Sequence, residues 1–212
     1  MGQKVSPTGF RVGIIKDWSS RWFGGDRYPE YLKTDITIRK FLKKRLRGMA
    51  VDSVKIERSP ANLKVVIHTA RPGLVIGRGG SGIEQIKQQL QALLRKKVPL
   101  QVEVQEIRNP DSSAAVVAES LAEQIEKRMP FRRAMKQTLM RLIAARDVKG
   151  AKLQASGRLN GAEIARTEHM EEGSLPLQTI RADIDFARAI AYTTYGTVGI
   201  KVWVYKGDVF EK

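Results

Sequence analysis

The chain has 212 residues, and its 38 lysines and arginines against 22 aspartates and glutamates give a formal net charge of +16 at pH 7. Hydrophobic residues make up 42% of it, enough for a folded core, which excludes a purely disordered basic tail. A folded body this basic attracts a polyanion, because each phosphate it neutralises releases condensed counterions; nucleic acid is therefore the first partner to expect and an anionic membrane surface the second. The sequence has no cysteine, and its only histidines are His68 and His169, so we expect no disulfide, no cysteine- or histidine-based metal site and no histidine-based catalytic triad. We expect neither a metal nor a cofactor.

The sequence shows no sign of a membrane or export segment. No apolar run reaches the roughly 18 residues that a membrane span needs, and the first residues lack the apolar core of a signal peptide. Gly2 and Ser6 match the short N-myristoylation pattern, which we interpret as a chance match. We therefore expect a cytoplasmic protein with no membrane partner.

Residues 1–33 combine glycines, aromatic residues and cations, Lys4 and Arg11 among the last. This composition indicates an irregular extension whose aromatic side chains pack on the domain or on a partner, with stacking on bases as the alternative.

A helix is predicted to follow, capped by Thr34 or Asp35 and ended by Gly48. One side of it carries an apolar stripe and the other a run of cations, which is either a solvated face or a phosphate contact. The stripe is Ile38, Phe41, Leu42 and Leu46, and the cations are Arg39, Lys40, Lys43, Lys44 and Arg47.

The segments 54–58 and 64–68 alternate in hydropathy and are separated by the turn sequence 59–62, which predicts a hairpin. A glycine-rich loop, a helix and a strand at 102–104 come next. The apolar face of that helix is expected to contain Ile83, Ile86, Leu90, Leu93 and Leu94. Asn109-Pro110-Asp111 marks the boundary of this first α+β domain, which we place at residues 34–109.

Residues 110–212 predict a second α+β domain with two helices on a mainly antiparallel sheet. Asp111 or Ser112 is expected to cap the first helix, and Pro130 to separate it from a second helix running to about Asp147. Alternation around residues 151–155, 180–186 and 198–204 predicts strands.

The loop Gly77-Arg78-Gly79-Gly80 lies between the apolar triplet Leu74-Val75-Ile76 and a helix. Glycines let a backbone approach a ligand closely, and the helix directs free N–H groups and its positive dipole end at the loop. Arg78 adds a charge. These features are typical of a phosphate-binding loop.

Two families use such a loop. Gly77, Gly79 and Gly82 satisfy the dinucleotide-binding pattern G-x-G-x-x-G, with Glu103 as the expected ribose ligand, but the preceding strand would be very short and the later strands are not arranged as a doubly wound sheet. The segment 75–83 also resembles the V-I-G-x-x-G-x-x-I signature of the KH module, whose loop clamps single-stranded backbone. On that resemblance the candidate RNA-binding residues are Ile76, Gly77, Arg78, Gly79 and Gly80.

The helix after Pro130 opens with a group of cations. At about 100° per residue, Arg132, Arg133 and Lys136 share one arc of it, while Phe131 and Met135 lie on a neighbouring arc that should face the core. We call Arg132, Arg133 and Lys136 the basic cluster. Their mutual repulsion suggests an anionic partner, and three solvated charges are the alternative.

Longer segments, in the same order along the chain, resemble the small ribosomal subunit protein three family in its bacterial or organellar form. The resemblance covers essentially the full length. It is carried by the glycine loop and by Gly2–Arg11, Phe131–Lys136, Ser156–Arg166, Arg181–Asp185 and Thr193–Gly196.

This resemblance implies a type II KH domain followed by a family-specific C-terminal α+β domain. It implies a non-enzymatic constituent of the small-subunit head that binds rRNA and neighbouring small-subunit proteins, in the cytoplasm or in an organelle. It also implies that the basic cluster faces incoming mRNA and helps to open mRNA helices. Further candidate rRNA contacts are Lys4, Arg11, Arg158 and Arg166.

The loop departs from the family in one respect. Members often carry two basic residues there, whereas this chain has only Arg78 and the extra glycines Gly79 and Gly82, so its grip on RNA should be weaker or more adaptable.

Other functions stay open on sequence alone. One is a free KH-type RNA-binding regulator or chaperone. Another is an enzyme, either dinucleotide-dependent or a nuclease with Asp183 and Asp185 on one strand face, although ion pairs with Arg181 and Arg188 would also explain those two carboxylates.

Overall fold

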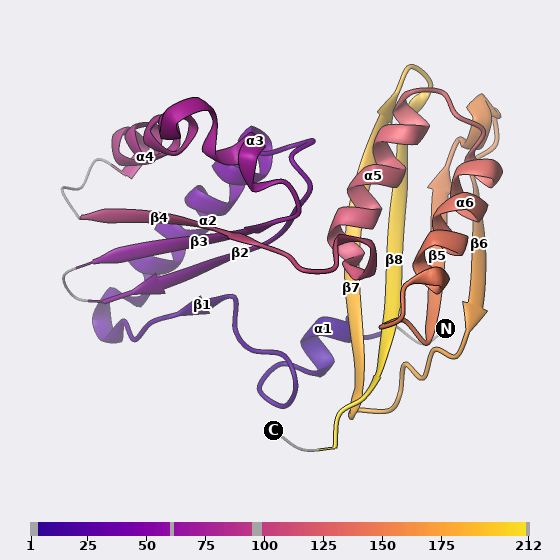
Figure 1. The fold of residues 1–212 in the computed structure, drawn as a ribbon, viewed down its shortest axis with the longest axis horizontal. Coiled ribbons are helices and arrows are strands. Elements are labelled where there is room, and N and C mark those ends of the chain that lie inside the picture. The colour runs from indigo at the N-terminus through magenta and orange to yellow at the C-terminus, as the bar shows by residue number, and fades with distance from the viewer. Residues whose placement is uncertain (1–3, 60–61, 95–98, 211–212) are drawn as a thin grey trace. The chain divides into compact units, whose positions relative to one another are not determined.

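The computed structural model describes residues 4–59, 62–94 and 99–210 (Figure 1). The chain forms two compact units, one of Trp18–Arg108 and one that joins Met1–Asp17 to Asn109–Lys212. The break between the two units falls between Arg108 and Asn109. Of residues 4–33, those up to Asp17 belong to the unit that contains Asn109–Lys212, and those from Trp18 belong to the other unit.

The unit Trp18–Arg108 has the element order helix, two strands, two helices, strand, preceded by the short β1 (Ser20–Arg21) and a 3-10 turn at Gly25–Arg27. Its sheet has the order β1-β2-β3-β4, in which β2 and β3 pair antiparallel while β3 and β4 pair parallel. The main elements are α2 (Tyr28–Arg45), β2 (Val51–Arg58), β3 (Leu63–Thr69), α3 (Pro72–Ile76), α4 (Ser81–Leu94) and β4 (Leu100–Glu106).

The helix α2 begins six residues earlier than predicted, at Tyr28, with Pro29 in its first turn, where a missing N–H costs nothing. Asp35 is therefore not a cap. Asp35 lies in the middle of the helix and is buried. Its carboxylate accepts a hydrogen bond from Trp22 Nε1 at 2.8 Å and forms an ion pair with Arg58 at 3.0 Å. The carboxylate of Asp35 therefore binds side chains from other parts of the unit and does not cap the helix as predicted.

The core of this unit lies where α2 and α4 pack on the sheet. Ile38, Leu42 and Leu46 of the predicted stripe are buried, as are Ile86 and Leu90 of α4. Leu93 is 47% exposed, so its place on the apolar face was predicted wrongly; the core needs only the positions nearest the sheet. The predicted hairpin is confirmed by the β2–β3 register, and its turn residues 60–61 lie outside the described residues.

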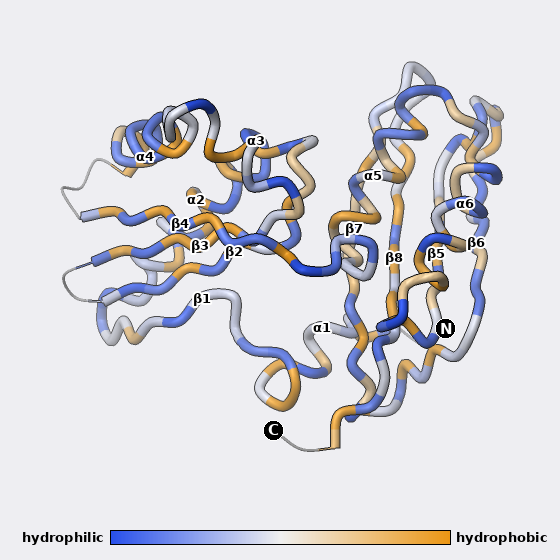
Figure 2. Tube along the Cα trace, in the orientation of Figure 1, coloured by the Kyte–Doolittle hydropathy of each residue, from blue (hydrophilic) through white to orange (hydrophobic). Residues whose placement is uncertain are grey.

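The other unit packs two helices on one face of the antiparallel sheet β6-β5-β8-β7, as predicted (Figure 1). Hydrophobic residues recur along α5 and β8, which both contribute to its core (Figure 2). The elements are α1 (Pro7–Phe10), α5 (Ala114–Glu126), α6 (Phe131–Ala144), β5 (Gly150–Gly157), β6 (Arg166–Gly173), β7 (Ala182–Thr193) and β8 (Gly196–Asp208), with 3-10 turns at Pro110–Ser112 and Leu159–Gly161.

Three local predictions in this unit were wrong. The cap of α5 is Ser113, whose Oγ accepts from Val116 N at 3.4 Å, because a 3-10 turn occupies the residues before it. The helix α6 ends at Ala144, three residues before Asp147. Ile180 precedes β7 and is 43% exposed, so it does not take part in the strand.

Arg11 ties the N-terminal segment to this unit. Its side chain is fully buried and donates to the carbonyls of Ala182 at 2.6 Å, Thr179 at 2.8 Å and Leu177 at 3.1 Å, as well as to Pro7 O at 3.0 Å. Burial lowers the pKa of the guanidinium, and nearby Asp183 partly offsets that effect. With its donors committed to backbone carbonyls, Arg11 is a structural residue here and does not join the proposed RNA contacts.

Candidate nucleic-acid interface

The glycine loop joins two helices. The triplet Leu74-Val75-Ile76 belongs to α3, the loop forms a 3-10 turn at Arg78–Gly80, and α4 begins at Ser81. A dinucleotide fingerprint needs a strand directly before its glycines, so this helix–loop–helix arrangement rules out that interpretation of the motif.

The backbone of the loop requires glycine. Gly77, Gly79 and Gly80 have φ angles of 71°, 61° and 82°, in the left-handed region where a Cβ is strained. Gly82 is needed for a different reason: a Cβ there would lie 2.5 Å from Val75 O and 2.9 Å from Ile76 O. The extra glycine therefore lets the start of α4 pack directly on the end of α3.

Arg78 is exposed, and within the described parts of the chain its side chain has no hydrogen bond or ion pair. Its carbonyl accepts from Ser81 Oγ at 2.9 Å, which links the loop to the first turn of α4. The loop thus presents one free guanidinium beside the N-terminal end of a 14-residue helix, an arrangement that favours an anion.

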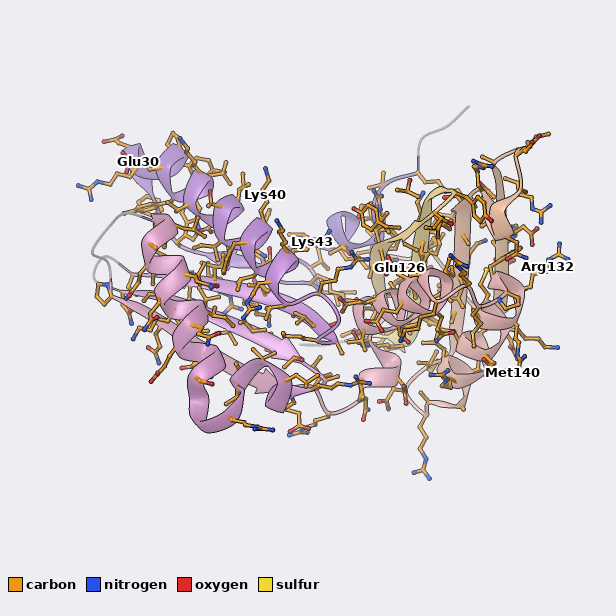
Figure 3. All side chains as sticks on the ribbon, turned by 90° about the horizontal axis from the view of Figure 1, so that it is seen from above. Glu30, Lys40, Lys43, Glu126, Arg132 and Met140 are labelled. Carbon is orange, nitrogen blue, oxygen red and sulfur yellow. The ribbon has the colours of Figure 1, made fainter. Side chains whose placement is uncertain are left out.

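The basic cluster projects from a rigid helix. Phe131 and Met135 of α6 are buried at 2% and 0% exposure and fix its orientation, while Arg132, Arg133 and Lys136 are exposed. Arg132 points outward from α6 (Figure 3). The predicted separation into a core arc and a cationic arc is confirmed.

Glu168, which no sequence motif singled out, binds two arginines at the edge of this site. Glu168 on β6 accepts from Arg132 Nε at 3.0 Å and Nη2 at 3.1 Å, and also pairs with Arg166 Nε at 3.0 Å. The hydrogen bond with Glu168 raises the pKa of Arg132, and the same bond lowers the pKa of Glu168. Arg166 therefore lies at the edge of the basic cluster. The guanidinium groups of Arg132 and Arg166 are 5.8 and 6.0 Å from the centroid of the Phe131 ring.

Arg133 and Lys136 differ from Arg132 because neither has an ion pair among the residues that the structure describes. They are the two cations of the basic cluster that are immediately available to a phosphate.

Of the other candidate contacts, Arg158 mainly supports a turn. It donates to Ala162 O at 2.9 Å and Tyr195 O at 3.2 Å and so fixes the 3-10 turn Leu159–Gly161. Lys4 is exposed. The pKa of Glu171 is lowered mainly by the hydrogen bond from Lys152, and the positive charge of Lys4 helps to lower it.

The cations on α2 also differ in their roles: one is bonded to the rest of the unit and others are exposed. Arg39 donates to Val54 O, Ser19 O and Ser20 Oγ at 2.7–2.8 Å, so it holds the sheet. Lys40 and Lys43 project from the helix into solvent (Figure 3).

Asp183 and Asp185 do not form an open carboxylate pair. A bulge between Asp183 and Ile184 interrupts the alternation of β7. Asp183 pairs with Lys16 at 3.1 Å, and Asp185 accepts from Ala114 N at 3.0 Å. Their partners thus differ from the expected Arg181 and Arg188, but both carboxylates are engaged. No cluster of three potential metal ligands occurs in the described part of the chain.

The element order of the first unit and its helix–GXXG–helix motif define a type II KH domain, and the second unit is an antiparallel sheet with two helices on one face. Family models agree: the KH domain matches residues 37–112, and the C-terminal domain of ribosomal protein S3 matches residues 121–204.

Curated relatives named small ribosomal subunit protein uS3 match almost the whole chain. The protein from Agathobacter rectalis is 53% identical over 209 residues, covering 99% of this chain and 94% of the relative. Those from Synechocystis and Methylococcus capsulatus are 52% and 50% identical, covering 99% and 100% of this chain and 87% and 94% of the relatives. The chain belongs to the bacterial-type uS3 family and is a structural component of the small ribosomal subunit. No helix in the described ranges is long and apolar enough to cross a membrane.

Proposed function

We propose that this chain binds small-subunit rRNA, contacts neighbouring small-subunit proteins, and lines the path by which mRNA enters. In this proposal the basic cluster meets the phosphates of incoming mRNA. The glycine loop, with Ile76 at its edge, contacts single-stranded backbone. The protein acts without catalysis.

The observation that carries the proposal is the geometry of α6. Exposed cations project from a helix whose neighbouring face is held in the core by Phe131 and Met135. A cation on a rigid helix loses less conformational entropy when it binds phosphate than a cation on a flexible loop would lose. Each phosphate that it neutralises also releases counterions.

Opening of mRNA helices would follow from binding alone. A surface that holds single strands better than duplex shifts the equilibrium toward the open form by its difference in affinity for the two forms. Such a surface needs no fuel, which fits a chain without a G-x-x-x-x-G-K-[ST] sequence.

The bacterial relatives favour a cytoplasmic ribosome as the location. Sedimentation of a lysate separates this proposal from a free KH-type regulator or chaperone. The protein should comigrate with the small subunit at moderate salt, whereas a regulator would sediment slowly in a free pool.

The basic cluster is tested by replacing Arg132, Arg133 and Lys136 together by alanine in the full chain. Binding of oligouridylate should lose up to three charges of salt dependence, at about 0.7 log units of slope per charge for single strands. The measurement is fluorescence anisotropy across a range of salt concentrations.

The matched control replaces Lys40, Lys43 and Lys44 of α2, which are exposed and change the net charge equally. An equal loss of slope in both variants would reduce the effect to net charge, and an unchanged slope in the cluster variant would exclude phosphate contact by this face.

A further inference from the structure

The sheet of the C-terminal unit has a second face, opposite α5 and α6. Side chains alternate along each strand, and Val198, Ile200, Val202 and Val204 of β8 point into the core under the helices. The intervening positions therefore lie on the other face. In β7 and β8 these positions include Phe186, Arg188, Lys201 and Trp203, which we call the sheet platform.

The sheet platform consists of two adjacent cross-strand pairs. Phe186 is in register with Trp203, and their ring centroids lie 5.2 Å apart at 38°. Both rings are half-buried, and Trp203 packs against the buried cluster of Ala182, Ile184 and Tyr205, so each ring leaves only part of its surface for a base. Arg188 is in register with Lys201, and its guanidinium lies 5.2 Å from the centre of the Phe186 ring. An aromatic pair and a cationic pair are thus side by side on one surface.

The cationic pair is unfavourable in the isolated protein. Like charges directly opposite each other on neighbouring strands repel. The same-face positions around Arg188 and Lys201 hold no carboxylate: they are Phe186, Ile190, Gly199, Trp203 and, on β5, Gln154. Neither cation has an ion pair in the part of the chain that is described. An anionic ligand would remove this repulsion.

The aromatic pair narrows the ligand further. A phosphate or an acidic peptide would satisfy the cations alone, but RNA also supplies flat bases that stack on aromatic rings and on arginine planes. The exposed Ile190 and Tyr192 continue the surface along β7, and Gln154 of β5 is in register with Lys201. A protein-binding patch would instead be depleted of lysine, whereas Lys201 lies at the centre of this surface.

We propose that the sheet platform is a second binding surface for single-stranded RNA, in which bases stack on Phe186 and Trp203 and phosphates meet Arg188 and Lys201. This surface goes beyond the proposed role of the basic cluster, because α6 lies on the other face of the same sheet. It requires an unpaired segment, since only unstacked bases can reach the rings.

The experiment compares three variants of the full chain with oligouridylate as the probe. Arg188→Ala with Lys201→Ala should reduce the salt slope by about 1.4 log units, for two charges on a single strand. Phe186→Leu should weaken binding about fivefold or more with no change of slope, because stacking releases no counterions. Lys40→Ala with Lys43→Ala is the charge-matched control, and thermal unfolding checks that each variant is folded.

Each result decides the proposal. Loss of slope in the double variant beyond its control, with loss of affinity in Phe186→Leu, supports it. Unchanged binding in both overturns it, and so does a loss of slope in the double variant that is no larger than in its control. The same variants are then made in the chain whose basic cluster is replaced by alanine. If the losses of salt slope from the two surfaces add, both surfaces bind RNA. If only one set of substitutions reduces the slope, the other surface does not bind RNA.

Discussion

The glycine loop and the basic cluster offer phosphate two different kinds of site. The loop uses its backbone: three glycines with positive φ angles, the N-terminal end of α4 and one free guanidinium at Arg78. The basic cluster uses side chains on a helix anchored by Phe131, and its backbone is ordinary α-helix. The same ligand chemistry is thus supported by conformation in one place and by charge in the other.

This difference determines how each site can fail. A backbone site tolerates changes of charge nearby but not a side chain where the chain must turn or pack closely. A cationic site tolerates exchange among surface side chains but depends on salt and on competing carboxylates. Substitutions that separate these two modes test the comparison directly.

The largest effect is expected at Gly82. In Gly82→Ala the new methyl group would lie 2.5 Å from Val75 O, so α3 and α4 must move apart. We expect a loss of about 1–3 kcal/mol in stability, as for overpacked positions. Hydrogen exchange should show reduced protection along α4, and Arg78 should contribute less to RNA binding.

Gly73→Ala is the control for this variant. Gly73 lies in α3 without a positive φ angle, and a methyl group added there would have no neighbour within 4 Å. The substitution should be neutral or stabilise by about 0.4–1 kcal/mol, because alanine restricts the unfolded chain. Equal destabilisation by both substitutions would mean that close packing at Gly82 is not what limits the loop.

A smaller effect is expected at Glu168, which competes with phosphate for Arg132 and Arg166. Glu168→Gln should raise the affinity for oligouridylate about two- to fivefold and steepen its salt dependence, because exposed ion pairs are weak and are easily exchanged. Anisotropy titrations measure both quantities. Glu171→Gln, on the same strand but paired with Lys152, is the control and should change neither as much. A weaker affinity in Glu168→Gln would show that the carboxylate orients the arginines for RNA and does not compete with it.

The sequence predicted what depends on local pattern. The buried stripe of α2, the inward face of α6 and the alternation of β8 follow from apolar spacing, and each is confirmed. The signature from Val75 to Ile83 indicated the KH domain, and the structure explains Gly82 by a contact with α3 that no local pattern contains.

What the sequence could not predict depends on partners far away in the chain. Arg11 lies in a segment whose composition suggested a nucleic-acid contact. Its guanidinium instead donates to backbone carbonyls, among them that of Ala182, which is 171 positions away. Glu168 and Arg132 meet through sheet topology. The strand β6 carries few apolar residues because it is a mostly exposed edge, so hydropathy showed no sign of it.

The smallest expected effect is a pH dependence of the same competition. The hydrogen bond from Arg132 holds the pKa of Glu168 below its ordinary value of 4.5. The ion pair therefore stabilises the folded protein at pH values above the unfolded pKa, and this contribution is lost as pH falls through the lowered folded pKa. Protonated Glu168 no longer holds the guanidinium groups, so the RNA affinity of the native chain should approach that of Glu168→Gln in acid.

Oligouridylate is the suitable probe for this measurement because uracil does not become protonated in mildly acidic solution. The ratio of the two affinities, measured from neutral pH down to about pH 3.5, cancels the titration of carboxylates that both chains share. It should fall toward one only below about pH 4.5, since the lowered pKa keeps Glu168 ionised until then. A ratio that falls already near pH 6 would contradict the tight pairing of Glu168 with Arg132, and a constant ratio would show that Glu168 does not control access of RNA to the basic cluster.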